Sequence, residues 1–140
     1  MKKSLAILAL VLCAMLFCTM AMAGGHDFKF NLYAGNAFGG GRVTSATSTR
    51  YKKADNENRA YVTVTERSIK DDDKVRLFVV KDGHSSAQTE KLYVEATSPS
   101  LNNTKTLKYT TTYDTDTYYR LRCEAVTLWK DAMVAGRWNP

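Results

Sequence analysis

Cysteine and histidine are the side chains that most often supply a nucleophile and its base, and both are scarce in this chain. Past residue 23 the chain has one cysteine, Cys123, and the only histidines are His26 and His84. A Cys123–His84 pair would provide a thiolate nucleophile. However, Cys123 alternates with Leu121 and Ala125, so the thiol is expected to face the core as a small hydrophobic group. The alternative is an exposed thiol that links two chains or attacks a substrate.

Paired carboxylates are the second candidate chemistry, because two of them at a working separation can hydrolyse a glycosidic bond. Asp114 and Asp116 alternate along one predicted strand face, and Glu90 and Glu95 precede them. Nothing in their spacing predicts that any two lie at that separation. We expect them to be solvated acids of turns.

Metal and phosphate sites are not expected. The run at residues 71–73 has three aspartates, but it lacks the alternate oxygen ligands around a glycine that calcium loops use. The histidines form no H-x-H or H-E-x-x-H zinc pattern. The glycine-rich residues 34–42 lack the lysine-serine/threonine ending and the following helix of a phosphate loop. With no G-x-S-x-G motif either, the chain is predicted to be no enzyme and to need no cofactor.

Exposed aromatic residues indicate a binding surface more strongly than the acids and histidines indicate a catalytic site. Tyr33, Tyr61 and Tyr118 fall on predicted outward faces, among Arg and Lys. Such residues can stack on sugar rings or sit at a membrane interface. The alternatives are cross-strand tyrosine pairs that stabilise a sheet, or an outward face covered by a second sheet.

The element that must position these residues is the clearest strand in the chain, residues 118–126. Side chains alternate between the two faces of a strand, so this pattern predicts one face on a core and one in water. The apolar face carries Tyr119, Leu121, Cys123 and Ala125, and the other face carries Tyr118, Arg120, Arg122 and Glu124.

Similar alternation recurs along the chain with turn signals between the segments. No stretch of ten residues past the N-terminal segment has a helical period, although residues 126–131 are expected to contain one helical turn. Residues 77–80 are apolar on both faces, which predicts a central, covered strand. The pattern predicts an all-β, antiparallel β-sandwich (Greek-key-like) of about seven or eight strands after an N-terminal helical signal peptide. The other predicted strands are residues 28–33, 43–52, 59–66, 74–81, 91–97, 105–113 and 132–138.

The N-terminal segment predicts export. Lys2 and Lys3 precede an apolar run, and Ala21 and Ala23 match the small-x-small rule for signal-peptide cleavage. Cleavage before Gly24 would leave residues 1–23 as the signal peptide and residues 24–140 as a single β-sandwich domain. The rival interpretation is an uncleaved membrane anchor.

The net charge of the predicted mature chain indicates which class of partner to expect. Removing Lys2 and Lys3 from the 20 basic residues leaves 18 against 14 acidic residues, a net charge of +4. This mild excess favours an anionic cell-envelope polymer, with another protein as the alternative partner. No basic stripe suggests nucleic acid, and residues 24–140 contain no apolar run that would cross a membrane.

The C-terminal third resembles a known group of proteins. The segments YYRLRCEA (residues 118–125) and VAGRW (residues 134–138) are similar to small secreted proteins of Gram-positive bacteria that are carried as a domain of unknown function. Residues 28–32 and 58–64 fit the same layout. The resemblance implies an exported, β-rich protein and supplies no catalytic residues.

Together these features predict a secreted, extracellular, non-enzymatic protein that binds or coats something at the cell exterior. A bacteriocin-like antagonistic protein is the first alternative. A small secreted hydrolase or protease inhibitor is the second.

Overall fold

The computed structural model describes residues 25–35 and 42–140, and these form nine strands and no helix. Ala21, Ala23 and Gly24 of the predicted cleavage site lie outside the described residues. The strands are β1 (His26–Leu32), β2 (Ser45–Thr47), β3 (Tyr51–Lys52), β4 (Arg59–Ser68), β5 (Lys74–Lys81), β6 (Leu92–Val94), β7 (Thr104–Lys108), β8 (Tyr118–Thr127) and β9 (Ala132–Asn139).

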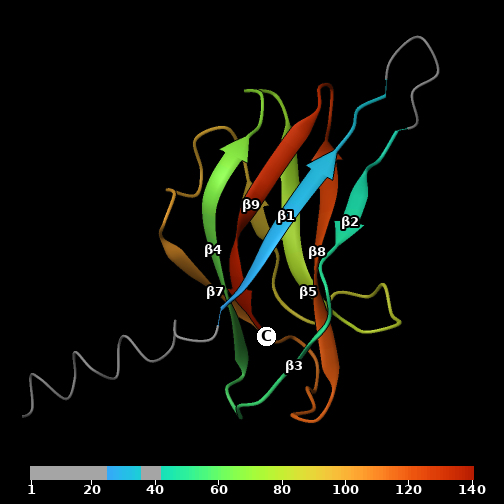
Figure 1. The fold of residues 1–140 in the computed structure, drawn as a ribbon, viewed down its shortest axis with the longest axis vertical. Coiled ribbons are helices and arrows are strands. Elements are labelled where there is room, and N and C mark those ends of the chain that lie inside the picture. The colour runs from blue at the N-terminus through green and yellow to red at the C-terminus, as the bar shows by residue number, and fades with distance from the viewer. Residues whose placement is uncertain (1–24, 36–41) are drawn as a thin grey trace, which may run out of the picture.

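The strands form two antiparallel sheets, which confirms the predicted β-sandwich. One sheet has the order β1-β9-β4-β7, and the other has the order β2-β8-β5-β6 with β3 also paired to β8. β4 and β5 follow each other along the chain and lie in opposite sheets, and the same is true of β8 and β9. The turns that join them therefore gather at the ends of the molecule (Figure 1).

Alternation along each strand builds the core between the sheets. Along β8, Tyr119, Leu121 and Cys123 are buried, while the residues between them are partly exposed. Ala125 is partly buried and packs against the same core. The other sheet contributes the alternate positions of β1 and β4, and Trp138 of β9 is the largest fully buried side chain.

Strand β5 is covered on both faces, as the sequence predicted. Val75, Leu77 and Val79 point into the core. Phe78 and Val80 lie on the opposite, outward face and are nevertheless buried. The strand is central, because β8 pairs along one side of it and β6 along the other.

The structure corrects the number and extent of the edge strands. Residues 43–52 form two short strands instead of one, because a side chain interrupts the ladder. Ser48 Oγ accepts the Leu121 amide at 2.9 Å, and the Ser48 amide donates to the Leu121 carbonyl at 2.8 Å. Strands predicted over residues 91–97 and 105–113 are shorter, as β6 and β7. The result is nine strands where about seven or eight were expected.

The predicted helical turn at residues 126–131 does not form, and one aspartate explains why. Asp73 is buried, contrary to the expectation that residues 71–73 form a solvated turn. Its carboxylate accepts the amides of Trp129 at 2.6 Å and of Lys130 at 3.0 Å. These amides are thus held by a side chain from the turn between β4 and β5, not by helical carbonyls. The described residues contain no helix long and apolar enough to span a membrane.

Candidate functional site: a basic face on the five-stranded sheet

The outward side of the β2-β8-β5-β6 sheet carries a group of basic side chains that the pairing register brings together. On β8, Arg120 and Arg122 point outward because Leu121 and Cys123 point into the core. The register places Arg122 opposite Phe78 and Arg120 opposite Val80 of β5. We call this surface the basic face. Its charged members are Arg50, Arg76, Asp82, Lys91, Arg120, Arg122 and Glu124.

At one end of the basic face, Asp82 joins two arginines. Its Oδ1 accepts Arg120 Nε at 2.5 Å, and its Oδ2 accepts Arg50 Nη1 at 3.0 Å. The Arg50 guanidinium also lies over the ring of Tyr118, 4.9 Å from the centroid. Asp82 follows the last residue of β5, and its amide bonds to the Tyr118 carbonyl at 2.9 Å, which fixes the carboxylate beside β8.

At the other end, Glu124 joins the second pair of arginines. Its Oε2 accepts Arg76 Nε at 3.2 Å and Nη2 at 2.8 Å, and its Oε1 accepts Arg122 Nε at 2.7 Å. Arg76 and Glu124 are register partners on β5 and β8. Arg122 is two residues from Glu124 and therefore shares its face.

The arginines keep both carboxylates ionised. Hydrogen bonds from Arg120, and then from Arg50, lower the pKa of Asp82. For Glu124, burial alone would raise the pKa, but hydrogen bonds from Arg76 and Arg122 outweigh burial and lower it. The bond to Glu124 in turn raises the pKa of Arg76. Both acids are therefore ionised at neutral pH.

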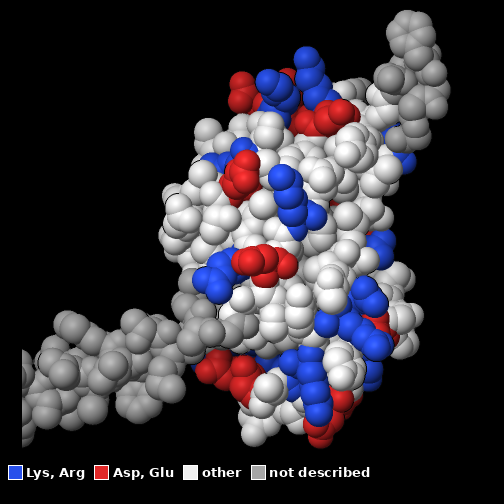
Figure 2. Space-filling view, in the orientation of Figure 1, with Lys and Arg blue, Asp and Glu red and all other residues white. Residues whose placement is uncertain are grey.

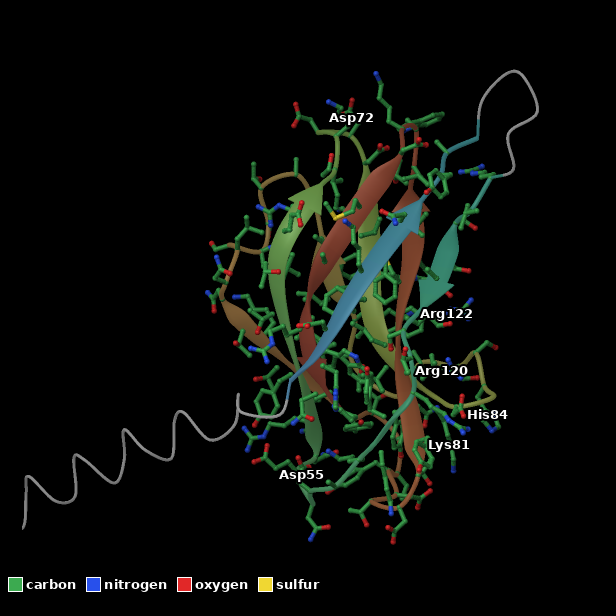
Figure 3. The ribbon with its side chains drawn as sticks, in the orientation of Figure 1. Asp55, Asp72, Lys81, His84, Arg120 and Arg122 are labelled. Atoms are coloured by element: carbon green, nitrogen blue, oxygen red, sulfur yellow. The ribbon has the colours of Figure 1, made fainter. Side chains whose placement is uncertain are left out.

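The basic face carries most of the excess charge of residues 24–140. It has five cations and two carboxylates, a net charge of +3, whereas the whole of that region carries +4. The neighbouring pairs Lys52–Asp116 and Lys74–Glu95 add no net charge. In Figure 2, basic side chains line the right edge of the molecule at the heights where Figure 3 labels Arg122, Arg120 and Lys81.

Cys123 and His84, the one nucleophile–base pair considered, lie in different environments. Cys123 is 0% exposed, and burial raises the pKa of its thiol to about 12. His84 is exposed in the loop after β5, where Figure 3 labels it at the margin of the molecule. His26 instead stacks on Tyr51 with 3.4 Å between ring centroids. The prediction that Cys123 faces the core is confirmed.

The acidic candidates are also dispersed. Asp114 pairs with Lys81, Asp116 with Lys52 and Glu95 with Lys74. Glu90 accepts the amide of Lys108 at 3.3 Å. Each of these four carboxylates thus pairs with, or accepts a hydrogen bond from, a different residue. Within residues 25–35 and 42–140, no three His, Cys, Asp or Glu side chains are grouped so that they could hold a metal ion.

Two of the three predicted outward tyrosines are well exposed. Tyr33 and Tyr118 lie on the surface, and Tyr118 borders the basic face beside Arg50. Tyr61 is partly buried, and its hydroxyl donates to the Glu57 carboxylate. The outward face of the five-stranded sheet is not covered by another sheet, so this alternative for Tyr118 is wrong.

Sequence reasoning placed Arg120, Arg122 and Glu124 on one outward face but missed the residues that complete it. Arg76 lies on β5 and Lys91 directly precedes β6, so their place on this face follows from the pairing of β5 with β6 and β8. Asp82 directly follows the covered strand β5, and this position was the one available indication that it could approach β8.

Comparisons with protein-family models, with curated proteins and with solved structures found no match to this chain. The resemblance to small secreted proteins of Gram-positive bacteria therefore stays a prediction.

Proposed function

We propose that this protein is an exported, non-enzymatic binding protein that holds an anionic polymer of the cell exterior on its basic face. The observation that carries this proposal is the net charge of +3 on one side of the five-stranded sheet. A surface with such a local excess attracts polyanions and raises their association rate.

The shape of the basic face favours an extended ligand over a small one. Its arginines are spread over a sheet surface: Arg76 comes from β5, Arg120 and Arg122 come from the neighbouring β8, and Arg50 lies between β2 and β3. Arg120 and Arg122 are two residues apart on β8, so their Cα atoms are separated by about 7 Å. A polymer with charges at a similar spacing could contact several arginines at once, and several weak contacts add to a useful affinity.

The two carboxylates support this role because they hold the arginines without cancelling them. Each acid binds two guanidinium groups, so each trio keeps a net charge of +1. A guanidinium has five N–H donors, and an arginine fixed by one or two bonds still offers the others to a ligand. Fixing the side chains beforehand reduces the entropy lost on binding.

Salt-dependent binding tests the proposal. The exported protein is titrated with dextran sulfate and with uncharged dextran at 0.05 and 0.5 M salt, concentrations that differ about threefold in Debye length. We expect binding to dextran sulfate alone, weakened about tenfold or more at the higher salt. Binding to both polymers, or to neither, would overturn the proposal.

Matched charge variants locate the surface. Arg120→Gln and Lys29→Gln remove one positive charge each, and Lys29 is exposed on β1 of the opposite sheet. Arg120→Gln should weaken dextran sulfate binding several-fold, whereas Lys29→Gln should change it less than about twofold. Equal effects would show that net charge matters and the basic face does not.

A further inference from the structure

Phe78 marks a special point on the basic face. It points outward from β5, yet only 2% of it is exposed. The Arg76 guanidinium carbon lies 5.9 Å from the ring centroid, and Lys91 Nζ lies 5.8 Å from it. Arg122 is the register partner of Phe78 on β8. Two cations therefore lie within about 6 Å of the ring centroid, and a third is the neighbour of Phe78 on β8; we call Arg76, Lys91 and Arg122 the Phe78 cluster.

Two members of the Phe78 cluster keep unused donors. Arg122 gives Nε to Glu124, and its two Nη groups have no acceptor among the described residues. The Lys91 ammonium contacts the Phe78 ring and has no ion pair or hydrogen bond within the described part of the chain. Glu124 is the one carboxylate bound to the cluster, which leaves it a local charge of +2.

We propose that the Phe78 cluster binds a tetrahedral oxyanion ester, a phosphodiester or a sulfate ester, carried by the polymer. This inference rests on the proposed function and names the chemical group that the basic face selects. Arginine and lysine are the side chains that bind such groups, arginine through paired N–H donors and lysine as a point charge.

The geometry favours a tetrahedral group over a carboxylate. A carboxylate has two oxygens in one plane, and Glu124 shows how such a group is used here, with one oxygen for each arginine. Lys91 directly precedes β6 and Arg122 lies on β8, and these two strands pair with opposite sides of β5, which carries Phe78. An oxyanion with oxygens in several directions can reach the unused donors of both residues. The buried ring beneath lowers the local dielectric constant and strengthens the attraction.

The test compares three soluble polymers of similar length and charge. The exported protein is titrated with a synthetic glycerol phosphate polymer, with dextran sulfate and with polyglutamate. We expect both oxyanion polymers to bind more tightly than polyglutamate, and at least one of them about tenfold or more tightly. The tighter of the phosphate and sulfate arms identifies the source of the group.

Variants separate this inference from the proposed function. Lys91→Gln should weaken oxyanion binding about tenfold, whereas Lys29→Gln on the other sheet should change it less than about twofold. Arg122→Lys keeps the charge but removes the planar guanidinium, and should weaken binding several-fold. Thermal unfolding of each variant checks that the fold is kept.

Three outcomes decide the question. Equal affinity for polyglutamate and for both oxyanion polymers would overturn the inference and leave the proposed function standing. The same would follow if Lys91→Gln behaved like Lys29→Gln. If none of the three polymers bound, both proposals would fall.

Discussion

Cys123 is a packing residue whose thiol is held away from solvent. It lies on β8 between Leu121 and Ala125 and opposite Leu77 of β5. Burial, and secondarily the charge of Glu124, raises its pKa to about 12, so the fraction present as thiolate at neutral pH is very small. A buried, protonated thiol is a poor nucleophile.

Thiol labelling checks this assignment. A thiol reagent should modify native Cys123 slowly and the denatured chain quickly. Cys123→Ser would bury a hydroxyl in an apolar site and should lower the free energy of unfolding by about 1–3 kcal/mol. Cys123→Ala, a modest volume change, is the control and should cost less than the serine variant. Rapid labelling of the native protein, or a disulfide-linked dimer without reductant, would contradict the buried assignment.

Lys53 is the residue that sequence reasoning misjudged most. No local sequence pattern indicates that Lys53 is buried, yet its side chain is 0% exposed. Its ammonium donates to Asp55 Oδ1 at 2.7 Å and to the carbonyl oxygens of Arg59 at 3.3 Å and Pro140 at 3.2 Å. It also lies over the Tyr109 ring, 5.1 Å from the centroid. One buried charge thus ties the start of β4 to the chain beyond β9.

Replacing Lys53 tests that role. Lys53→Met fills a similar volume but leaves two main-chain carbonyls without their donor, so it should lower the free energy of unfolding by about 3 kcal/mol. Lys52→Met is the matched control, because Lys52 is half exposed and pairs with an exposed Asp116. That change should cost less than about 0.5 kcal/mol in denaturant unfolding. Equal costs would mean that the Lys53 contacts contribute no more than a surface pair.

At the scale of the element, β9 depends on a glycine at its centre. Gly136 pairs with Phe28 of β1 on one side and with Val64 of β4 on the other, beside the register shift between Val64 and Glu66. A Cβ there would overlap the Thr63 carbonyl and come within 3.1 Å of Phe28 Cε1. The main chains approach so closely that no larger residue fits without moving a strand.

Gly136→Ala should therefore lower the free energy of unfolding by about 3 kcal/mol or more, the upper end of the range for overpacking. Gly83→Ala is the comparison, since that glycine has open space around it and a φ of +79°. It should cost only the strain of the left-handed conformation, about 1–2 kcal/mol. Chemical denaturation of the three proteins measures both values. A tolerated Gly136→Ala would contradict the pairing described for β9.

Long strands were predictable from the sequence and short ones were not. Alternation defines β4 and β8, because burial of one face repeats every second residue, and an apolar run on both faces defines β5. The ends of the short strands and the shape of the turns depend on single contacts between residues far apart in the sequence. Examples are Ser48 with Leu121 and Asp73 with the amide of Trp129. No local pattern encodes such partners. Three of the seven charged members of the basic face lie on β8 and were likewise predictable as one outward face, whereas the place of Arg76 and Lys91 on that face depends on strand pairing.

The whole molecule presents two different sheet surfaces. The outward side of the four-stranded sheet shows mixed charges, such as Asp27 with Arg137 and Glu57 with Arg59. The five-stranded sheet holds the excess positive charge. Under the proposed function, this asymmetry gives the molecule a preferred side for an anionic ligand. The acids that bind the arginines on that side also link stability to pH.

The free energy of unfolding should decrease at acidic pH, because the pKa values of Asp82 and Glu124 are lowered in the folded protein. A carboxyl whose pKa is lower in the folded state stabilises the fold above its ordinary pKa, and this stability is lost as the pH falls through the folded-state pKa. The ordinary values are 3.8 for Asp82 and 4.5 for Glu124. The contribution should therefore be complete at neutral pH, begin to fall as the pH drops to these ordinary values, and be lost only below the lower folded-state pKa values.

Denaturant unfolding between pH 7 and pH 3 measures this loss. Glu124→Gln should be less stable than the parent at pH 7, by roughly 1 kcal/mol since the site is only partly buried. The difference should shrink below about pH 4, because the parent then loses the same charge-assisted bonds. Asp27→Asn is the control, as that carboxylate is largely exposed and lies 3.5 Å from Arg137. It should follow the parent at every pH. A gap between Glu124→Gln and the parent that stayed constant down to pH 3 would show that the arginines do not hold Glu124 ionised.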